Sequence, residues 1–258
     1  MSGSRPPIPA EMKRELRREA HYGCVCCGNP IIEYHHIKDW CIVKEHTIDN
    51  LVVLCPSCHY RATVKELTPE RILRMKKEPY NSKLKTVSEN FFINQHGETS
   101  LLIGSVRINN ANIILRVNND SAISLSKDID GYTLLNLKIY DEHHKLVAQV
   151  KDNEWCANVS DQIWDITFSK GILDIRCSAR KLWLKIPTNN SEIKIDGKTY
   201  TDKHEILFDS KNGIKIKYDD HEVYIKDSKI TFNGIPNDCP VIQIGKTMFN
   251  TGAVFYYD

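Results

Sequence analysis

The spacing of hydrophobic and polar residues changes near residue 90, and the two parts of the chain predict different secondary structure. In residues 10–20, apolar residues recur at every fourth position among charged ones, which predicts one amphipathic helix. Thr68 followed by Pro69 predicts the start of another helix. The other elements expected before residue 80 are strands at 31–37 and 51–54, a loop at 38–50, and a helix beginning at 58. The helix that Thr68 and Pro69 introduce continues from residue 70.

After residue 90, short runs of alternating apolar and polar residues follow one another, such as the segments YTLLNLKIY and GIKIKY. Asn, Asp, Gly and Ser separate these runs, and strands at such even spacing are typical of an all-β domain. The repeats are too irregular to choose between a β-sandwich and a β-solenoid. The predicted fold is therefore α+β, with a small N-terminal domain at 1–80, a linker at 81–90 and a larger β-rich domain at 91–258.

The composition is that of an ordinary globular protein, and the charge is unevenly divided between the two parts of the chain. Of the 258 residues, 41% are hydrophobic and 26% are charged, and no apolar run has the length of a membrane span. The first residues lack the hydrophobic segment of an export signal, so we expect a cytoplasmic protein with no membrane partner. Up to residue 90 there are 15 Lys and Arg against 11 Asp and Glu, whereas the remainder has 20 against 22. The first part is therefore the one suited to a phosphate-rich partner.

Six of the nine cysteines lie between residues 24 and 58. In a chain without an export signal, such clustering favours metal binding over disulfides. Cysteines two residues apart form a turn that places two thiolates on one tetrahedral ion, and two such turns complete a structural Zn²⁺ site. The predicted zinc ligands are Cys24, Cys27, Cys55 and Cys58. Cys26 lies inside the first turn and offers an alternative to Cys24 or Cys27, although the two-residue spacing favours those two.

Histidines and an asparagine accompany the cysteine pairs in a recognisable order. The pattern is Cys24-x-x-Cys27, Tyr34-His35-His36-Ile37, Asn50-Leu51 and Leu54-Cys55-x-x-Cys58-His59. It resembles the HNH endonucleases in their zinc-stabilised form over residues 18–65. The resemblance implies a ββα-metal core in the N-terminal domain and hydrolysis of DNA phosphodiester bonds.

Individual roles follow from that resemblance. His36 matches the general base, since a neutral imidazole takes a proton from the attacking water. His35 and His59 match ligands of a catalytic Mg²⁺ or Mn²⁺. Asn50 matches the middle residue, which orients the base or touches the metal site. Since side chains of adjacent strand residues point to opposite faces, convergence of His35 and His36 on one phosphate requires a local departure from regular strand geometry.

The remaining expectations are less specific. Arg61, two residues after His59, is the best candidate for a DNA phosphate contact among the basic residues around the motif, and His46 is expected to be a solvated loop residue. The β-rich domain suits target recognition, homo-oligomerisation, or the sensing of an activating ligand or protein. Small HNH proteins with an added domain resemble phage-defence and restriction nucleases. The rival interpretation is a non-catalytic zinc module that binds nucleic acid, carried on a β-domain scaffold.

Overall fold

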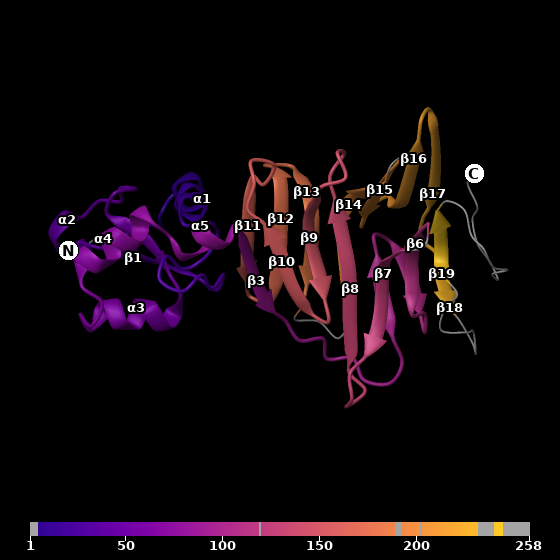
Figure 1. The fold of residues 1–258 in the computed structure, drawn as a ribbon, viewed down its shortest axis with the longest axis horizontal. Helices are drawn as coiled ribbons and strands as arrows, with labels where there is room; N and C mark the ends of the chain where they lie inside the picture. Colours follow the sequence, from indigo (N-terminus) through magenta and orange to yellow (C-terminus); the bar gives the residue numbers. More distant parts are fainter. Residues whose placement is uncertain (1–4, 119, 189–191, 202, 232–239, 245–258) are drawn as a thin grey trace. The chain divides into compact units, whose positions relative to one another are not determined.

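The computed structural model describes residues 5–118, 120–188, 192–201, 203–231 and 240–244. The end of the predicted β-rich domain, residues 245–258, lies outside the described residues. The chain forms two compact units, which are drawn in Figure 1. The first unit contains Met1–Glu89 and Asn158–Ser169, and the second contains Asn90–Ala157 and Lys170–Asp258. The two units are described separately below.

The first unit is built from short helices around one antiparallel hairpin. Its elements are α1 (Ala10–Glu19), β1 (Glu33–His36), α2 (Trp40–Val43), β2 (Leu51–Leu54), α3 (Pro56–Thr63), α4 (Pro69–Lys77), α5 (Tyr80–Leu84), β3 (Thr86–Asn90), which ends at the boundary of the unit, and β11 (Asp165–Ser169). All four residues of β2 are buried, which matches its unbroken apolar run. Leu16 of α1 and Ile72 of α4 belong to the same core.

Two segments of this unit are more ordered than the sequence predicts. The expected loop at 38–50 contains α2, and the expected linker at 81–90 contains most of α5 and the whole of the strand β3. Asn81 shows why this second segment belongs to the first unit. Its side chain is buried and donates to the carbonyl oxygens of Gly28 at 3.0 Å and His21 at 3.2 Å. A buried amide that pairs with distant backbone leaves no periodic signal in the sequence.

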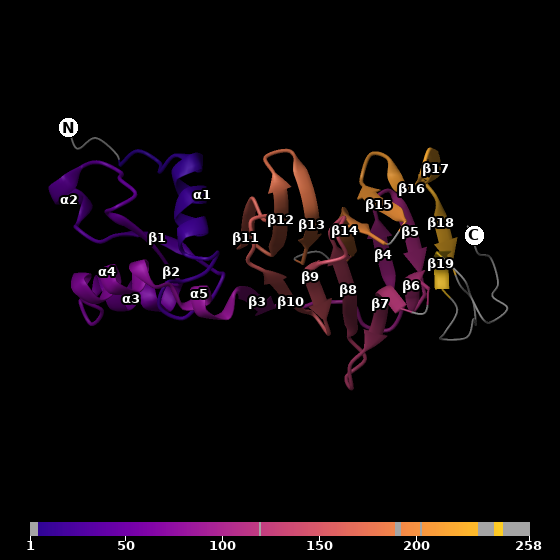
Figure 2. The same cartoon turned by 45° about the horizontal axis from the view of Figure 1, so that its top comes forward.

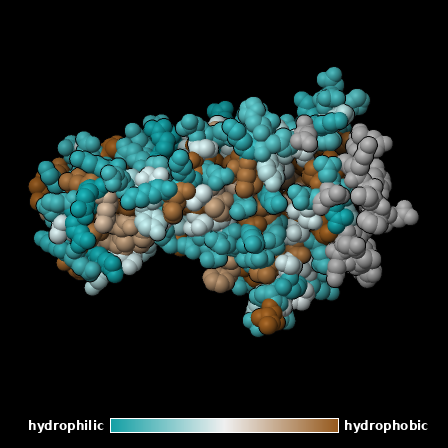
Figure 3. All heavy atoms as spheres, in the orientation of Figure 1, coloured by the Kyte–Doolittle hydropathy of each residue, from teal (hydrophilic) through white to brown (hydrophobic). Residues whose placement is uncertain are grey.

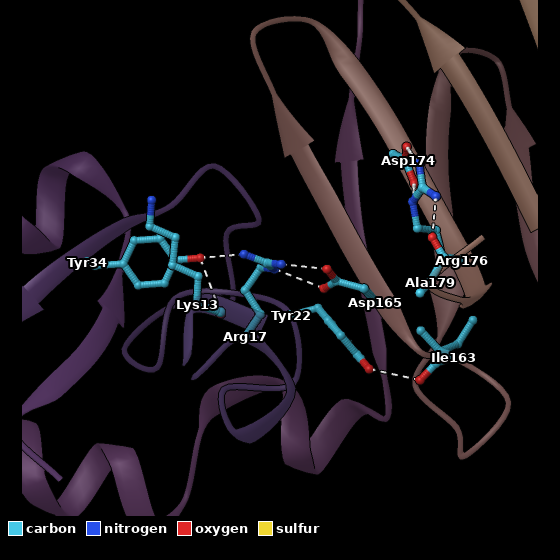
Figure 4. A network of polar contacts seen from close by, with 9 residues as sticks. All are labelled: Lys13, Arg17, Tyr22, Tyr34, Ile163, Asp165, Asp174, Arg176 and Ala179. Carbon is cyan, nitrogen blue, oxygen red and sulfur yellow. Dashed lines mark hydrogen bonds and ion pairs between the residues drawn. The ribbon is translucent and has the colours of Figure 1, made fainter. Parts of the chain in front are cut away.

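The return of residues 158–169 to the first unit also rests on polar contacts (Figure 4). Arg17 of α1 lies between two acceptors. It donates to both carboxylate oxygens of Asp165, at 2.9 and 2.5 Å, and to the hydroxyl of Tyr34 at 2.6 Å. The Tyr22 hydroxyl donates to the carbonyl of Ile163 at 3.0 Å. This network is the reason why a segment predicted in the β-rich domain folds with the motif.

The second unit is made of strands (Figure 1, Figure 2). They are β4 (Ser100–Ile103), β5 (Val106–Asn109), β6 (Ile113–Val117), β7 (Asp120–Lys127), β8 (Thr133–Tyr140), β9 (Leu146–Lys151), β10 (Glu154–Asn158), β12 (Ile172–Ser178), β13 (Lys181–Pro187), β14 (Ile193–Tyr200), β15 (His204–Asp209), β16 (Gly213–Tyr218), β17 (His221–Ile225), β18 (Lys229–Thr231) and β19 (Pro240–Ile244). Within the second unit, neighbouring strands of one sheet follow the order β19-β6-β7-β8-β9-β10, and those of another follow β12-β13-β14-β15-β16-β17. The β-rich character predicted for the second part is confirmed.

Alternation of buried and exposed side chains explains these sheets. Every second residue of β8 and of β14 is buried, which is the period of a strand with one face on a core. The two strands also contact each other, because the Tyr140 amide donates to the Thr199 hydroxyl at 3.0 Å. On the face visible in Figure 3, hydrophilic side chains predominate and apolar ones form small separate groups, as on ordinary protein surfaces. Among the described residues, no helix combines the length and the apolar character that a membrane crossing requires.

Candidate active site

The β1–β2 hairpin and the start of α3 bring the motif together. The antiparallel register pairs Glu33 with Leu54 and His36 with Leu51. Cys55 follows β2 directly and caps α3, whose first residue is Pro56. A proline at the first helical position is favourable because no N–H is required there. As a result, His59 lies in the first turns of a helix that begins immediately after the hairpin.

The cysteine pairs converge as the spacing predicts. The Sγ atoms of Cys24, Cys27, Cys55 and Cys58 all lie within 4.8 Å of one another. The Cys27 Sγ is 3.6 Å from that of Cys55 and 4.0 Å from that of Cys58. A tetrahedral Zn²⁺ with bonds of about 2.3 Å places its sulfur ligands about 3.8 Å apart. The four thiols therefore already have the separation that zinc requires.

Backbone geometry explains why these turns form. The Gly28 amide donates to the Cys24 carbonyl at 2.8 Å and closes the first turn. Gly28 has a φ of +80°, and a Cβ atom there would lie 2.2 Å from the Asn81 side chain, so glycine is required. In the second turn the Cys58 amide donates to the Cys55 Sγ at 3.5 Å. The sequence Cys-x-x-Cys thus creates the turn as well as the ligands.

The thiols titrate unequally without a metal. Hydrogen bonds from the Cys26 thiol and from nearby backbone amides lower the pKa of Cys24 to about 5. Burial raises the pKa of Cys27 to about 11 and also raises the pKa of Cys58. Cys24 is therefore a thiolate near neutral pH, whereas Cys27 and Cys58 need a cation to ionise. Cys26 lies outside the group of four, with its Sγ 3.3 Å from the Met75 sulfur, and supports Cys24 by donating to it.

His35 of β1 and His59 of α3 come together. Their ring centroids are 4.9 Å apart, with the rings edge to face. The Glu33 carboxylate contacts His59, since its Oε2 lies 2.6 Å from the His59 Nδ1. Glu33 is two residues before His35 on the same strand, and therefore on the same face. The sequence interpretation missed Glu33, although this two-residue spacing was the signal that could have found it.

His36 points into a different environment, as alternation along a strand requires. Its side chain is buried, and its Nδ1 lies 2.6 Å from the Arg5 Nη2. Since arginine only donates, Nδ1 accepts this bond and Nε2 carries the proton. The Nε2–H then donates to the His46 Nδ1 at 3.1 Å, and the His46 Nε2 donates to the Pro6 carbonyl at 2.9 Å. Burial, together with Arg5 and the neighbouring histidines, lowers the pKa of His36 to about 4, so that it is neutral at pH 7.

This arrangement corrects one expectation and extends the site. His46 is half-buried and belongs to a hydrogen-bonded chain with His36, so it is not a solvated loop residue. The Trp40 ring packs against both imidazoles, with centroids 5.4 Å from His36 and 4.7 Å from His46. Arg5 belongs to a proline-rich N-terminal arm whose contact with His36 has no local sequence signal. These contacts join segments that are far apart in the chain.

The Asn50 side chain forms hydrogen bonds with the backbone that follows β1. Its Oδ1 accepts from the Lys38 amide at 2.7 Å, and its Nδ2 donates to the Lys38 carbonyl at 3.1 Å. The Ile37 amide donates to the Asn50 carbonyl at 2.8 Å. Asn50 therefore clamps the two residues after His36, and its side-chain amide is already engaged by backbone.

Comparison with protein-family models decides the classification of this hairpin and helix. Residues 24–65 match the HNH endonuclease model. Comparison with the curated proteins and with the solved structures gives no match. The matched segment contains both cysteine pairs, His35, His36, Asn50 and His59, and identifies an HNH domain whose thiol cluster is consistent with the zinc-stabilised form.

The basic residues around the HNH domain have different surroundings. Arg61 is exposed, and its Nε lies 3.7 Å from a carboxylate oxygen of Glu66, which is a weak surface pair that leaves the guanidinium accessible. Arg17 is occupied by Asp165, and Arg14 stacks over the Trp164 ring at 4.6 Å. Two of the arginines on α1 thus have partners inside the first unit, whereas Arg61 faces solvent.

Proposed function

We propose that the chain is a metal-dependent HNH endonuclease that hydrolyses DNA phosphodiester bonds. One observation carries this proposal: the ring centroids of His35 and His59 are 4.9 Å apart, and His35 is next to His36 in the chain. The hairpin and helix that hold these histidines also contribute Cys55 and Cys58 to the cluster of four thiols. A purely structural zinc site has no use for these histidines. The Cys24, Cys27, Cys55 and Cys58 cluster fits structural Zn²⁺.

The residues beside the cluster have the chemistry that a catalytic divalent ion requires. Glu33, His35 and His59 offer a carboxylate and two imidazoles within one small area. Carboxylate and imidazole groups suit Mn²⁺, and carboxylate with waters suits Mg²⁺. Such an ion, when bound, stabilises charge on the phosphate and on the leaving oxygen. Glu33 and His59 are each partly exposed, so a phosphate group has access to them.

His36 acts as the general base in this proposal. Its low pKa keeps the imidazole neutral at pH 7, but Arg5 occupies the Nδ1 lone pair in this structure. Guanidinium groups bind phosphate strongly and in fixed geometry. A DNA phosphate therefore competes for Arg5 and frees Nδ1 to accept a proton from water, while His46 holds the opposite side of the ring. Asn50 contributes by fixing the chain at Lys38.

A non-catalytic zinc module that binds nucleic acid is the second candidate. Both ring nitrogens of His36 are engaged, and both polar groups of the Asn50 amide bond to Lys38. Those contacts are what a purely structural role for the two residues would produce. In that case Arg61 and the other exposed basic groups bind phosphate without cleavage.

The second unit has a controlling or targeting role in our proposal, in phage defence or restriction. It carries a pocket of about 460 Å³ whose lining includes Lys138, Tyr140, His144, Thr199 and Tyr200. A pocket of this size and mixed polarity suits a small activating ligand. Homo-oligomerisation through this unit and an activating protein are the other proposed modes of control. Plating of phage on cells with and without the protein tests the defence role.

The decisive experiment compares supercoiled plasmid cleavage by wild type and His36→Ala, with Mg²⁺ or Mn²⁺. Loss of a general base is expected to reduce the rate about 10²–10⁴-fold. His96→Ala, which alters a histidine of the second unit, is the matched control and retains wild-type activity. Normal cleavage by His36→Ala would exclude this residue as the base. DNA binding without cleavage by wild type, under either metal and with modified DNA, would favour the zinc-module candidate.

A further inference from the structure

The Glu33 carboxylate makes a short contact that reaches from β1 to α3. Its Oε2 lies 2.6 Å from the His59 Nδ1, a distance typical of a charge-assisted hydrogen bond. Neutral imidazole carries its proton on one nitrogen only, and a carboxylate accepts but does not donate. The contact therefore places the proton of a neutral His59 on Nδ1 and leaves the lone pair on Nε2.

The position of His59 is fixed independently of Glu33. Its backbone amide donates to the Cys55 carbonyl at 2.8 Å, and it directly follows Cys58 in the thiol cluster. The His35 ring stands edge-on at a centroid distance of 4.9 Å. With the backbone held by the cluster, the remaining freedom of His59 is the rotation and tautomer of its ring. Those are the two properties that a hydrogen bond at Nδ1 controls.

Ligating histidines commonly donate their second ring N–H to a carboxylate or a carbonyl, which fixes the ring and raises its basicity. We propose that Glu33 is a positioning residue that holds His59 as the Nδ1–H tautomer and presents its Nε2 to the divalent ion. This inference rests on the proposed nuclease function and adds a residue to its site. Glu33 is about half exposed, with 48% of its side-chain surface accessible, so it holds the ring without closing the site to phosphate.

The alternative role for Glu33 is that of a direct ligand. A direct ligand must turn its carboxylate away from His59, and both Glu33→Gln and Glu33→Ala then lose the ligand. A positioning residue behaves differently. Glu33→Gln keeps an oxygen acceptor at the same place, whereas Glu33→Ala removes it.

The first test reads the tautomer directly in the zinc-loaded full-length chain without added Mg²⁺ or Mn²⁺. Long-range nitrogen–proton NMR at about pH 8, above the ordinary histidine pKa of about 6.5, distinguishes Nδ1–H from Nε2–H. The His59 ring signal is assigned by its absence in His59→Gln. Wild type and Glu33→Gln are expected to show Nδ1–H, and Glu33→Ala is expected to show mainly Nε2–H. An unchanged tautomer in Glu33→Ala overturns the inference.

The second test measures Mn²⁺ affinity of the same proteins by titration. Loss of such a supporting hydrogen bond typically weakens metal binding about 10–100-fold, which is expected for Glu33→Ala, with a smaller loss for Glu33→Gln. Glu66→Ala, which alters an exposed acid of the same unit, is the matched control, and zinc content verifies folding. Equal losses in Glu33→Gln and Glu33→Ala indicate a direct ligand and overturn the positioning role. Absence of Mn²⁺ binding by wild type overturns the nuclease proposal as well, whereas intact binding with an unchanged tautomer overturns this inference alone.

Discussion

The two units of this protein are stabilised by different means. In the second unit, strands such as β8 and β14 bury every second side chain, so its core follows from simple alternation. The first unit has a small apolar core and places polar groups inside it. These are the Cys24 and Cys55 thiols of the cluster, the buried His36, and the Arg17–Asp165 ion pair. The comparison teaches that the HNH domain buries groups of its candidate site, Cys24, Cys55 and His36, together with its core.

Removal of zinc should have the largest effect, because it should destabilise the first unit and leave the second unit unchanged. Structural zinc contributes roughly 10 kcal/mol or more to the folding of zinc-finger peptides, and the small core of the first unit has few other contacts to replace it. Cys55→Ser, or a strong chelator, is therefore expected to unfold residues 5–89 and leave the strands of the second unit protected. Amide hydrogen exchange of each unit, with metal analysis showing about one zinc per chain, measures this.

Cys41→Ser is the control for the zinc experiment, since Cys41 is exposed and lies outside the cluster. It should retain zinc and normal exchange. Full protection of the first unit in the chelated protein would show that the thiol cluster is not required for its fold.

The ion pair between Arg17 and Asp165 offers a second, smaller test. The two side chains are only 13% and 9% exposed, and removal of one partner from such a buried pair typically costs about 3–5 kcal/mol. Arg17→Ala should therefore destabilise the first unit by that amount, read from denaturant-dependent exchange of its amides. It should also release residues 158–169, because Arg17 is a principal contact of that segment.

Arg176→Ala is the matched variant in the second unit. Arg176 pairs with Asp174 on a more exposed strand position, with 29% of its side chain accessible, and the expected loss is below about 1 kcal/mol. Similar losses for the two arginine variants would remove the distinction between the units.

The dependence of stability on pH should show the smallest effect. Burial lowers the pKa of His36 to about 4 from an ordinary value of 6.5, so the unfolded chain binds the proton more readily. The stabilisation is fully present above pH 6.5 and is lost as the pH falls toward 4. His36→Gln should show a smaller loss of melting temperature over this window than wild type. Parallel pH curves for the two proteins would contradict the buried, neutral state of His36.

Much of the HNH domain follows from local sequence. The Cys-x-x-Cys turns, the apolar run of β2, and the Thr68-Pro69 start of α4 are decided by residues that are close together in the chain. For that reason the spacing of Cys24, Cys27, Cys55 and Cys58 predicted a cluster that the structure contains. The order of His35, His36, Asn50 and His59 likewise predicted the family that residues 24–65 match.

The tertiary structure alone decided what those residues contact. The bonds of Arg5 to His36, Glu33 to His59, and Arg17 to Asp165 span 31, 26 and 148 positions, and no periodic pattern records such pairs. The polar partners are also common residue types that a sequence places equally well on a solvated surface. By itself, the sequence determined the ligands, the turns and the alternation, because each depends on neighbouring residues. The contact of Glu33 with His59, the burial of His36 and the return of residues 158–169 depend on the folded chain, because only folding brings their partners within hydrogen-bond distance.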